Sequence, residues 1–109
     1  MGKILAFSGS NSKNSINQKL IRLTSELIEE HEVEVIDLRD YDAPLYGIDL
    51  EIENGIPSSM KALSEKMSAV DGYIISTPEH NGSMSALLKN TIDWLSRFEQ
   101  KTFQNKPTV

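Results

Sequence analysis

The chain has 109 residues and no cysteine, and it has only four prolines, six glycines and one tryptophan. Without cysteine there can be no disulfide, no thiolate nucleophile and no cysteine-ligated zinc or iron–sulfur cluster. The sequence also lacks an apolar run near the roughly 18 residues of a membrane span. Its first residues are too briefly apolar for a signal peptide. We therefore expect no membrane segment and a cytoplasmic location.

Positive charge is also scarce, because eleven Lys and Arg face sixteen Asp and Glu, which gives a net charge of −5. Such a chain repels a polyanion at long range, and no basic stripe offsets that repulsion. We therefore expect no nucleic-acid partner. A small phosphate ligand stays compatible with this charge, because a few backbone N–H groups can bind it locally.

The length suits one domain, over residues 1–109, and the composition is that of an ordinary folded protein, with 39% hydrophobic and 25% charged residues. Continuous apolar runs predict buried strands at 3–8 and 73–76. The apolar residues Val33, Val35, Ile36 and Leu38 predict a second short strand at 33–38, and a fourth strand is expected to start at 106–109. Helical spacing predicts helices over about 15–30, 57–70 and 87–95. Residues 39–57 are predicted as a long loop and 78–82 as a turn.

Strands that alternate with helices predict an α/β fold, with a doubly wound parallel sheet between two helical layers and right-handed crossovers. Three strands and the beginning of a fourth are few for such a sheet. The third strand would present an apolar edge, so we expect the domain to continue beyond Val109 or a partner strand to complete it.

Polar residues gather in the segment 8–17, between the first strand and the first helix. Ligands of open α/β sheets bind beyond the carboxyl ends of the strands, and N–H groups at a helix start favour anions. The segment is therefore a candidate phosphate site, although it has neither the dinucleotide fingerprint nor a P-loop. For Ser15 a structural interpretation stays open: residues 15–18 fit a capping box in which Gln18 reaches back to the cap.

A second candidate loop, residues 77–83, follows the third strand. Asn81 and Gly82 can adopt positive φ, which turns backbone N–H groups outward toward a ring with carbonyl and nitrogen acceptors. His80 offers a flat ring for stacking, and the alternative is a solvated loop histidine. Glu79 can equally be a surface charge, and residues 81–83 a capping turn. No catalytic triad or metal cluster is visible in the sequence, since the two histidines are far apart.

The two loops together resemble those of the NAD(P)H-dependent FMN reductase family, which has a flavodoxin-like fold. The family's first motif reads Gly-Ser-x-Arg-x-x-Ser-x-Asn-x-x-Leu, and its second reads Pro-Glu-Tyr-Asn-x-Ser followed by Leu-Lys-Asn-x-x-Asp-Trp. The corresponding segments here are Gly9 to Leu20, Pro78 to Ser83 and Leu88 to Trp94. The resemblance extends over the whole chain, including the loop from Asp40 to Tyr46.

The resemblance implies non-covalently bound FMN, with NAD(P)H as co-substrate and a small-molecule electron acceptor as second substrate. It also implies a homodimer or homotetramer. The phosphate would be held by Ser10, Ser12, Ser15, Ile16 and Asn17. The edge of the isoalloxazine would meet the second loop, at Pro78, Glu79, His80, Asn81 and Gly82.

Two residues depart from the family pattern. Ser12 stands where the family has arginine, which removes a bidentate phosphate donor, and Lys13 beside it can supply a point charge instead. His80 stands where the family has tyrosine, which makes the stacking ring titratable near neutral pH. Two other functions remain open: an FMN-binding electron-transfer module that does not oxidise NAD(P)H, and an interaction domain that has lost its cofactor.

Overall fold

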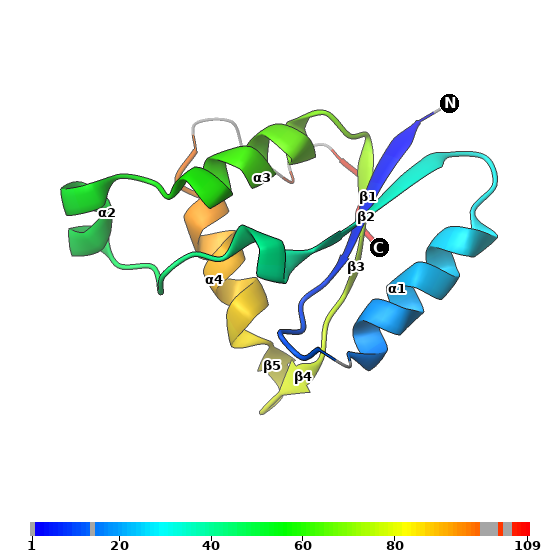
Figure 1. Ribbon diagram of the computed structural model, residues 1–109, viewed down its shortest axis with the longest axis horizontal. Helices are drawn as coiled ribbons and strands as arrows, with labels where there is room; N and C mark the ends of the chain where they lie inside the picture. Colours follow the sequence, from blue (N-terminus) through cyan, green and yellow to red (C-terminus); the bar gives the residue numbers. More distant parts are fainter. Residues whose placement is uncertain (1, 14, 99–102, 104–105) are drawn as a thin grey trace.

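The computed structural model describes residues 2–13, 15–98, 103 and 106–109. It shows a small parallel sheet between two layers of helices (Figure 1). The elements are β1 (Lys3–Ser8), α1 (Ile16–Leu27), β2 (Glu32–Asp37), the 3-10 helix η1 (Leu38–Tyr41), α2 (Ile48–Asn54), α3 (Ser58–Ser68), β3 (Gly72–Ser76), β4 (Glu79–His80), β5 (Ser83–Met84) and α4 (Ala86–Leu95).

The sheet has the order β2-β1-β3, with all three strands parallel. Strand β1 is the central strand, and its residues Leu5, Ala6 and Phe7 are at most 1% exposed. A strand that is covered on both faces must be apolar at consecutive positions, which explains the unbroken apolar run in the sequence. The predicted parallel sheet is confirmed, and its order matches the first three strands of a flavodoxin-like 2-1-3-4-5 sheet.

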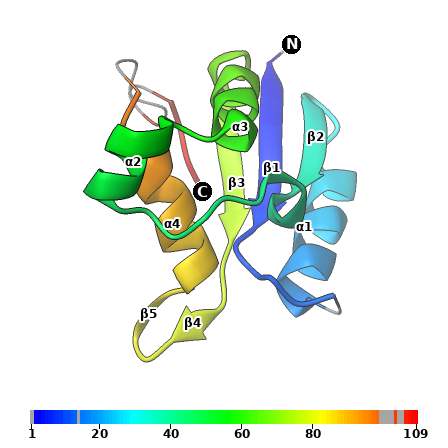
Figure 2. The same ribbon diagram turned by 60° about the vertical axis from the view of Figure 1, so that its left-hand side comes forward.

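Helices cover both faces of the sheet, with α1 on one side and α3 and α4 on the other (Figures 1 and 2). The predicted stripe of α3 is confirmed, because Met60, Leu63 and Met67 are fully buried. Trp94 of α4 is also fully buried and joins them in one core. The three-layer arrangement expected from the alternation of strands and helices is therefore present.

Helix α1 ends at Leu27 rather than near residue 30, and it turns most of its leucines outward. Leu20, Leu23 and Leu27 are 53%, 60% and 83% exposed, and Ile21 is the buried residue of the helix. Thr24 and Ser25 lie in the half-buried part, where their hydroxyls donate back to carbonyls one turn earlier. The periodicity thus predicted the helix correctly but did not tell which side faces the sheet.

Residues 39–57, predicted as loop, contain most of η1 and the whole of α2. We call residues 42–55 the arm. In Figure 1 the arm carries α2 to the end of the molecule farthest from α1. The missed helix has seven residues, which is too short to be stable without tertiary contacts. Local sequence pattern therefore gave little signal for it.

Helix α4 clamps the arm with side-chain hydrogen bonds. The Asn90 side chain accepts from the backbone N–H of Tyr46 (2.7 Å) and donates to the carbonyl of Pro44 (3.0 Å). The indole N–H of Trp94 donates to the same carbonyl (2.8 Å), and the rings of Tyr46 and Trp94 meet edge to face at 4.9 Å. The second family motif therefore holds the arm through its asparagine and tryptophan.

The end of the chain pairs with β3, as predicted. Tyr73 donates its N–H to the carbonyl of Pro107 (3.0 Å) and accepts from Val109 (3.1 Å), and Ile75 donates to the carbonyl of Val109 (2.9 Å). The bridge between Tyr73 and Thr108 is parallel. The next parallel strand of the sheet, which is distinct from the hairpin strand β4, therefore begins beside β3, at the edge where the sheet order requires it.

None of the helices among the described residues is long and apolar enough to cross a membrane.

Candidate functional site

The two candidate loops lie together at the edge of the sheet where β1 and β3 end, and both α1 and α4 begin there (Figure 2). A cavity of about 340 Å³ lies between them. Its lining combines hydroxyls and an amide with a ring and the first turn of α4: Ser10, Asn11, Ser12, Pro78, His80, Ser85, Ala86 and Leu87. Segments that are about 70 residues apart in the sequence therefore form one site.

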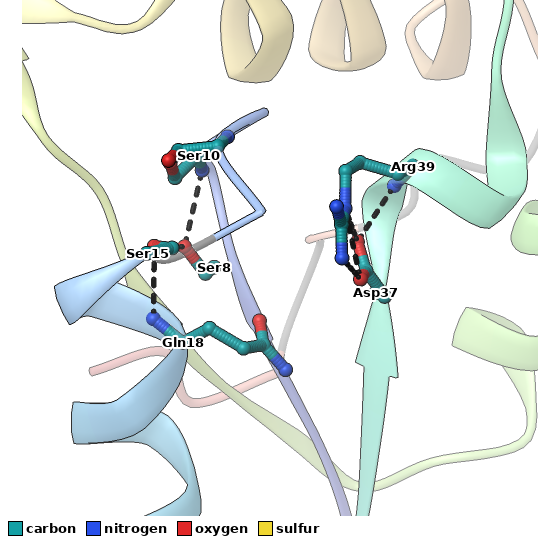
Figure 3. Close-up of polar contacts among 7 residues, drawn as sticks. Ser8, Ser10, Ser15, Gln18, Asp37 and Arg39 are labelled. Carbon is teal, nitrogen blue, oxygen red and sulfur yellow. Dashed lines mark hydrogen bonds and ion pairs between the residues drawn. The ribbon is translucent and has the colours of Figure 1, made fainter.

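Serine hydroxyls shape the first loop from inside (Figure 3). The Oγ of Ser8, which is 2% exposed, accepts from the N–H of Ser10 (3.0 Å), and the Oγ of Ser10 accepts from the N–H of Ser12 (3.1 Å). Each turn of the loop is thus fixed by a side chain two residues earlier. The loop therefore presents Ser10 and Ser12 to the cavity in a defined backbone conformation.

Ser15 is the N-cap of α1, as the capping interpretation predicted. Its Oγ accepts from the N–H of Gln18 (3.1 Å) and lies 3.5 Å from the Oγ of Ser8, and Ser15 is 8% exposed. The capping box also predicts that the Gln18 side chain reaches back to Ser15. Instead, the Nε2 of Gln18 is buried without a hydrogen-bond partner among the described residues. Figure 3 shows this side chain directed away from the cap.

Asn17 ties the first turn of α1 to the end of β3, because its side-chain oxygen accepts a hydrogen bond of 2.5 Å from the Oγ of Ser76. With its oxygen engaged, the amide of Asn17 offers its NH₂ group as a donor. Ser76 also accepts, through its carbonyl, from the N–H of Gly9 (2.8 Å). These contacts hold the serine loop against β3, the strand that leads into the second loop.

Gly9 is required by a close approach of backbone and helix. A Cβ at this position would lie 3.0 Å from the Cβ of Leu88 and 3.0 Å from the Oγ1 of Thr77. The buried Ser85, the N-cap of α4, donates to the carbonyl of Gly9 and accepts from the N–H of Leu88 (3.2 Å). The first loop and the first turn of α4 are therefore packed directly on each other.

The second loop is a β-hairpin rather than a simple turn, since β4 and β5 pair antiparallel. Its tip is formed by Asn81, with φ of 53°, and Gly82, with φ of 79°, which confirms the predicted positive φ at both positions. A turn with positive φ at both central residues has the backbone twist that matches the twist of the two hairpin strands. His80 reaches the cavity from this hairpin, while Glu79 is exposed.

One ion pair stands at the same sheet edge, after β2. The guanidinium of Arg39 binds both carboxylate oxygens of Asp37, at distances of 2.6 to 3.1 Å (Figure 3). These hydrogen bonds hold the pKa of Asp37 below its usual range. Asp37 thus stays ionised and keeps Arg39 in place beside β2, and neither residue lines the cavity.

Of the predicted site residues, the structure brings Ser10, Ser12, Pro78 and His80 together around the cavity. The others stand beside it, at the start of α1 or on the hairpin: Ser15, Ile16, Asn17, Glu79, Asn81 and Gly82. Sequence reasoning missed Ser85, Ala86 and Leu87. A serine before an apolar helical run is a capping signal that could have pointed to Ser85.

The donors around the cavity fit a phosphorylated, planar cofactor. Hydroxyls and backbone N–H groups at two helix starts suit a phosphate. The ring of His80 and the apolar side chain of Leu87 suit a flat ring system. The lining includes no carboxylate, so no fixed negative charge opposes an anion. The residues present therefore fit FMN.

The sheet order and the cavity at the ends of β1 and β3 define a flavodoxin-like α/β protein with a cavity at the carboxyl edge of its sheet, where proteins of this architecture bind ligands. The chain belongs to the NADPH-dependent FMN reductase family, whose family model matches residues 2–109.

Three relatives illustrate the similarity. The chain is 38% identical to a quinone reductase of Escherichia coli and 34% identical to an NAD(P)H-dependent FMN reductase of Pseudomonas aeruginosa, in both cases over 98% of this chain and 57% of the relative. Among solved structures, FerB, a flavoenzyme NAD(P)H:(acceptor) oxidoreductase from Paracoccus denitrificans, matches with a TM-score of 0.80 and 31% identity, over 99% of this chain and 58% of FerB. The chain therefore spans somewhat more than half the length of these relatives.

Proposed function

We propose that the protein is an FMN-dependent oxidoreductase that takes hydride from NAD(P)H and passes electrons to a small-molecule acceptor such as a quinone or an azo compound. The observation that carries this proposal is the cavity that joins the serine loop to the hairpin. The family match supports the class of protein, and the cavity supports a binding site for the cofactor in this chain. The similarity to quinone and FMN reductases supports the reaction class.

In this proposal the phosphate of FMN lies at the start of α1. Ser10 and Ser12 reach the cavity with hydroxyls, and Asn17 directs its amide from the first turn. Ile16 contributes its backbone, because its side chain is 79% exposed. Ser15 contributes by capping α1 and so fixing the N–H groups of this turn. Lys13, which is exposed, supplies positive charge where Ser12 replaces the family's arginine.

The hairpin holds the ring system of the cofactor. Positive φ at Asn81 and Gly82 turns the hairpin tip, and Pro78 and His80 form the wall of the cavity. Glu79 belongs to the same strand, where its backbone pairs with Met84. Bound FMN would supply two-electron chemistry, and this chain's residues bind it, orient it and shield it from water.

The remaining parts of the proposal concern the setting of the enzyme. We place it in the cytoplasm, because the chain has no cysteine and no membrane-spanning helix among its described residues. A homo-oligomer, dimer or tetramer, is part of the proposal. The net charge of −5 argues against a nucleic-acid partner.

The absorption spectrum of the purified protein with FMN tests the proposal. We expect stoichiometric binding and oxidation of NADPH or NADH with a quinone as acceptor. Ser12→Arg should tighten FMN binding and Ser12→Ala should weaken it, each by about 10-fold, the effect of one hydrogen bond to a charged group. Ser68→Ala, at the far end of α3, is the matched control and should leave the affinity unchanged.

The outcomes separate the alternatives. A protein that binds FMN but does not oxidise NAD(P)H would be an electron-transfer module. A protein that binds no FMN would be an interaction domain, and the proposal would be wrong. Equal effects of the Ser12 and Ser68 variants would show that the phosphate does not lie at the serine loop.

A further inference from the structure

Ser76, the last residue of β3, is hydrogen-bonded to both ends of the first loop. Its carbonyl accepts from the N–H of Gly9 (2.8 Å), where the loop leaves β1, and its hydroxyl donates to the side-chain oxygen of Asn17 (2.5 Å), where α1 has begun. Ser76 does not line the cavity. We therefore expect any effect of its hydroxyl on a ligand to pass through Asn17.

The side chain of Ser76 lies on the α1 face of the sheet. Successive residues of a strand point to opposite faces, and Tyr73, three residues earlier, donates its hydroxyl to the carbonyl of Met67 in α3 (2.9 Å), on the other face. Ser76 pairs with Ser8 in the parallel register, and the Oγ of Ser8 lies 3.5 Å from that of the N-cap Ser15. The ends of β3 and β1 therefore each contact the start of α1 with a serine hydroxyl.

The hydrogen bond to Ser76 decides which half of the Asn17 amide is available to a ligand. An asparagine side chain has an accepting oxygen and a donating NH₂ group. Here the oxygen takes the proton of the Ser76 hydroxyl, so the NH₂ group is left as the half that can bind an anion. A rotated amide would bring its oxygen toward the phosphate, and the two electronegative oxygens would repel each other. The Ser76 hydroxyl therefore favours the rotamer of Asn17 that a phosphate needs.

The amide is also fixed in place before a ligand arrives. Asn17 is the second residue of α1, is half-buried, and follows the N-cap Ser15 by two residues. A side chain that is already held in its binding rotamer loses little conformational entropy when the ligand binds. The donor of Asn17 therefore adds to the N–H groups of the same helix start, which favour an anion through the helix dipole.

We propose that Ser76 is a positioning residue of the phosphate site: by orienting the Asn17 amide, it makes the protein prefer FMN to riboflavin, the same flavin without a phosphate. This inference rests on the FMN site of the proposed function. The competing interpretation is that Ser76 only joins α1 to the sheet, which would give its hydroxyl no preference for a phosphorylated ligand.

Affinities for FMN and riboflavin, measured by quenching of flavin fluorescence, separate the two interpretations. Ser76→Ala should raise the dissociation constant for FMN by about five- to tenfold, the effect of one net hydrogen bond. The dissociation constant for riboflavin should change by less than about twofold, the usual scatter between independent sites, because riboflavin has no phosphate to meet Asn17.

Ser25→Ala is the matched control. Ser25 is also a half-buried serine that donates one hydrogen bond, to the carbonyl of Ile21 (2.7 Å), but it lies in the last part of α1. Its replacement should leave the ratio of the two dissociation constants unchanged. Urea unfolding followed by the fluorescence of the buried Trp94 verifies that each variant is folded.

A second variant tests the orientation of the amide without changing Ser76. Asn17→Asp keeps an oxygen for the Ser76 hydroxyl but replaces the NH₂ group with a carboxylate oxygen. Repulsion between this charge and the phosphate should raise the dissociation constant for FMN at least about 30-fold, while that for riboflavin stays within about twofold. In the Asn17→Ala variant, a further Ser76→Ala change should raise the dissociation constant for FMN by less than about twofold, because the residue through which Ser76 acts is gone.

A weaker preference for FMN in Ser76→Ala, absent from Ser25→Ala, is the expected result. Equal weakening of FMN and riboflavin by Ser76→Ala, wild-type FMN affinity in Asn17→Asp, or additive effects of Ser76→Ala and Asn17→Ala would each overturn the inference and leave the FMN site standing. A wild-type protein that binds neither flavin would instead overturn the proposed function itself, and the inference with it.

Discussion

Replacement of Asn90 by alanine tests whether the second family motif works as a clamp on the arm. Asn90 makes two hydrogen bonds, one from the N–H of Tyr46 and one to the carbonyl of Pro44. Neither bond touches the cavity. We therefore expect Asn90→Ala to lower the free energy of unfolding while leaving the FMN affinity of the folded protein unchanged.

The magnitude follows from what each group loses. A net hydrogen bond contributes about 0.5–1.5 kcal/mol. The carbonyl of Pro44 keeps the indole N–H of Trp94, and the half-buried Tyr46 N–H can reach water, so no large penalty for an unpaired group arises. Alanine favours a helix over asparagine by a few tenths of a kcal/mol, which offsets part of the loss. The net destabilisation should be about 1–2 kcal/mol.

Urea unfolding followed by tryptophan fluorescence measures this change. Trp94 is the single tryptophan, is fully buried, and lies beside the arm, so its emission reports on the clamp. Lys89→Ala is the matched control on the same helix: its exposed pair with Asp93, four residues away, contributes at most about 0.5 kcal/mol. If Asn90→Ala lowers the free energy of unfolding no more than Lys89→Ala does, the clamp is refuted. If Asn90→Ala lowers only the affinity for FMN, Asn90 belongs to the flavin site instead.

Three further predictions concern the site and the pH dependence of stability. Ser15→Ala should lower the free energy of unfolding by about 1 kcal/mol through loss of the helix cap, whereas Asn17→Ala should mainly lower the affinity for FMN, measured by fluorescence titration. The reverse pattern would assign the cap to Asn17 and FMN binding to Ser15. His80→Ala should weaken FMN binding in the same titration, because it removes a ring from the wall of the cavity, whereas His31→Ala at the opposite sheet edge should not. Unchanged affinity in the His80 variant would place this side chain outside the flavin site. Burial raises the pKa of the Tyr73 hydroxyl. The stability that this neutral hydroxyl contributes should therefore be complete below about pH 10, the ordinary pKa of tyrosine, and should be lost as the pH rises through the folded pKa. Chemical denaturation from pH 8 to 11 should show this loss of stability for the wild type and a smaller loss for Tyr73→Phe.

The alternation of strands and helices could be predicted from the sequence because each kind of element leaves its own hydrophobic pattern. The unbroken apolar run in β1 and the stripe of Met60, Leu63 and Met67 in α3 were sufficient for this. Ser15 as a cap and positive φ at Asn81 and Gly82 were equally local, since each depends on residues next to it in the chain. The two loops were recognised through their motifs, which are local as well.

Only the tertiary structure decided which distant segments meet. The segment that leads into the short helix α2 is held by hydrogen bonds from Asn90 and Trp94, which are 44 and 50 residues away from their partners Tyr46 and Pro44. A helix of seven residues carries little signal in its own sequence. The contribution of Ser85 to the cavity depends on its contact with the carbonyl of Gly9. Which side of α1 faces the solvent depends on which side chains pack against the sheet. A periodic pattern predicts an apolar stripe on a helix but does not tell which surface the stripe contacts. The sequence thus determined the main strands and helices and the local geometry of the two loops, whereas the cavity and the contacts between α4 and the arm arise from packing between elements far apart in the chain.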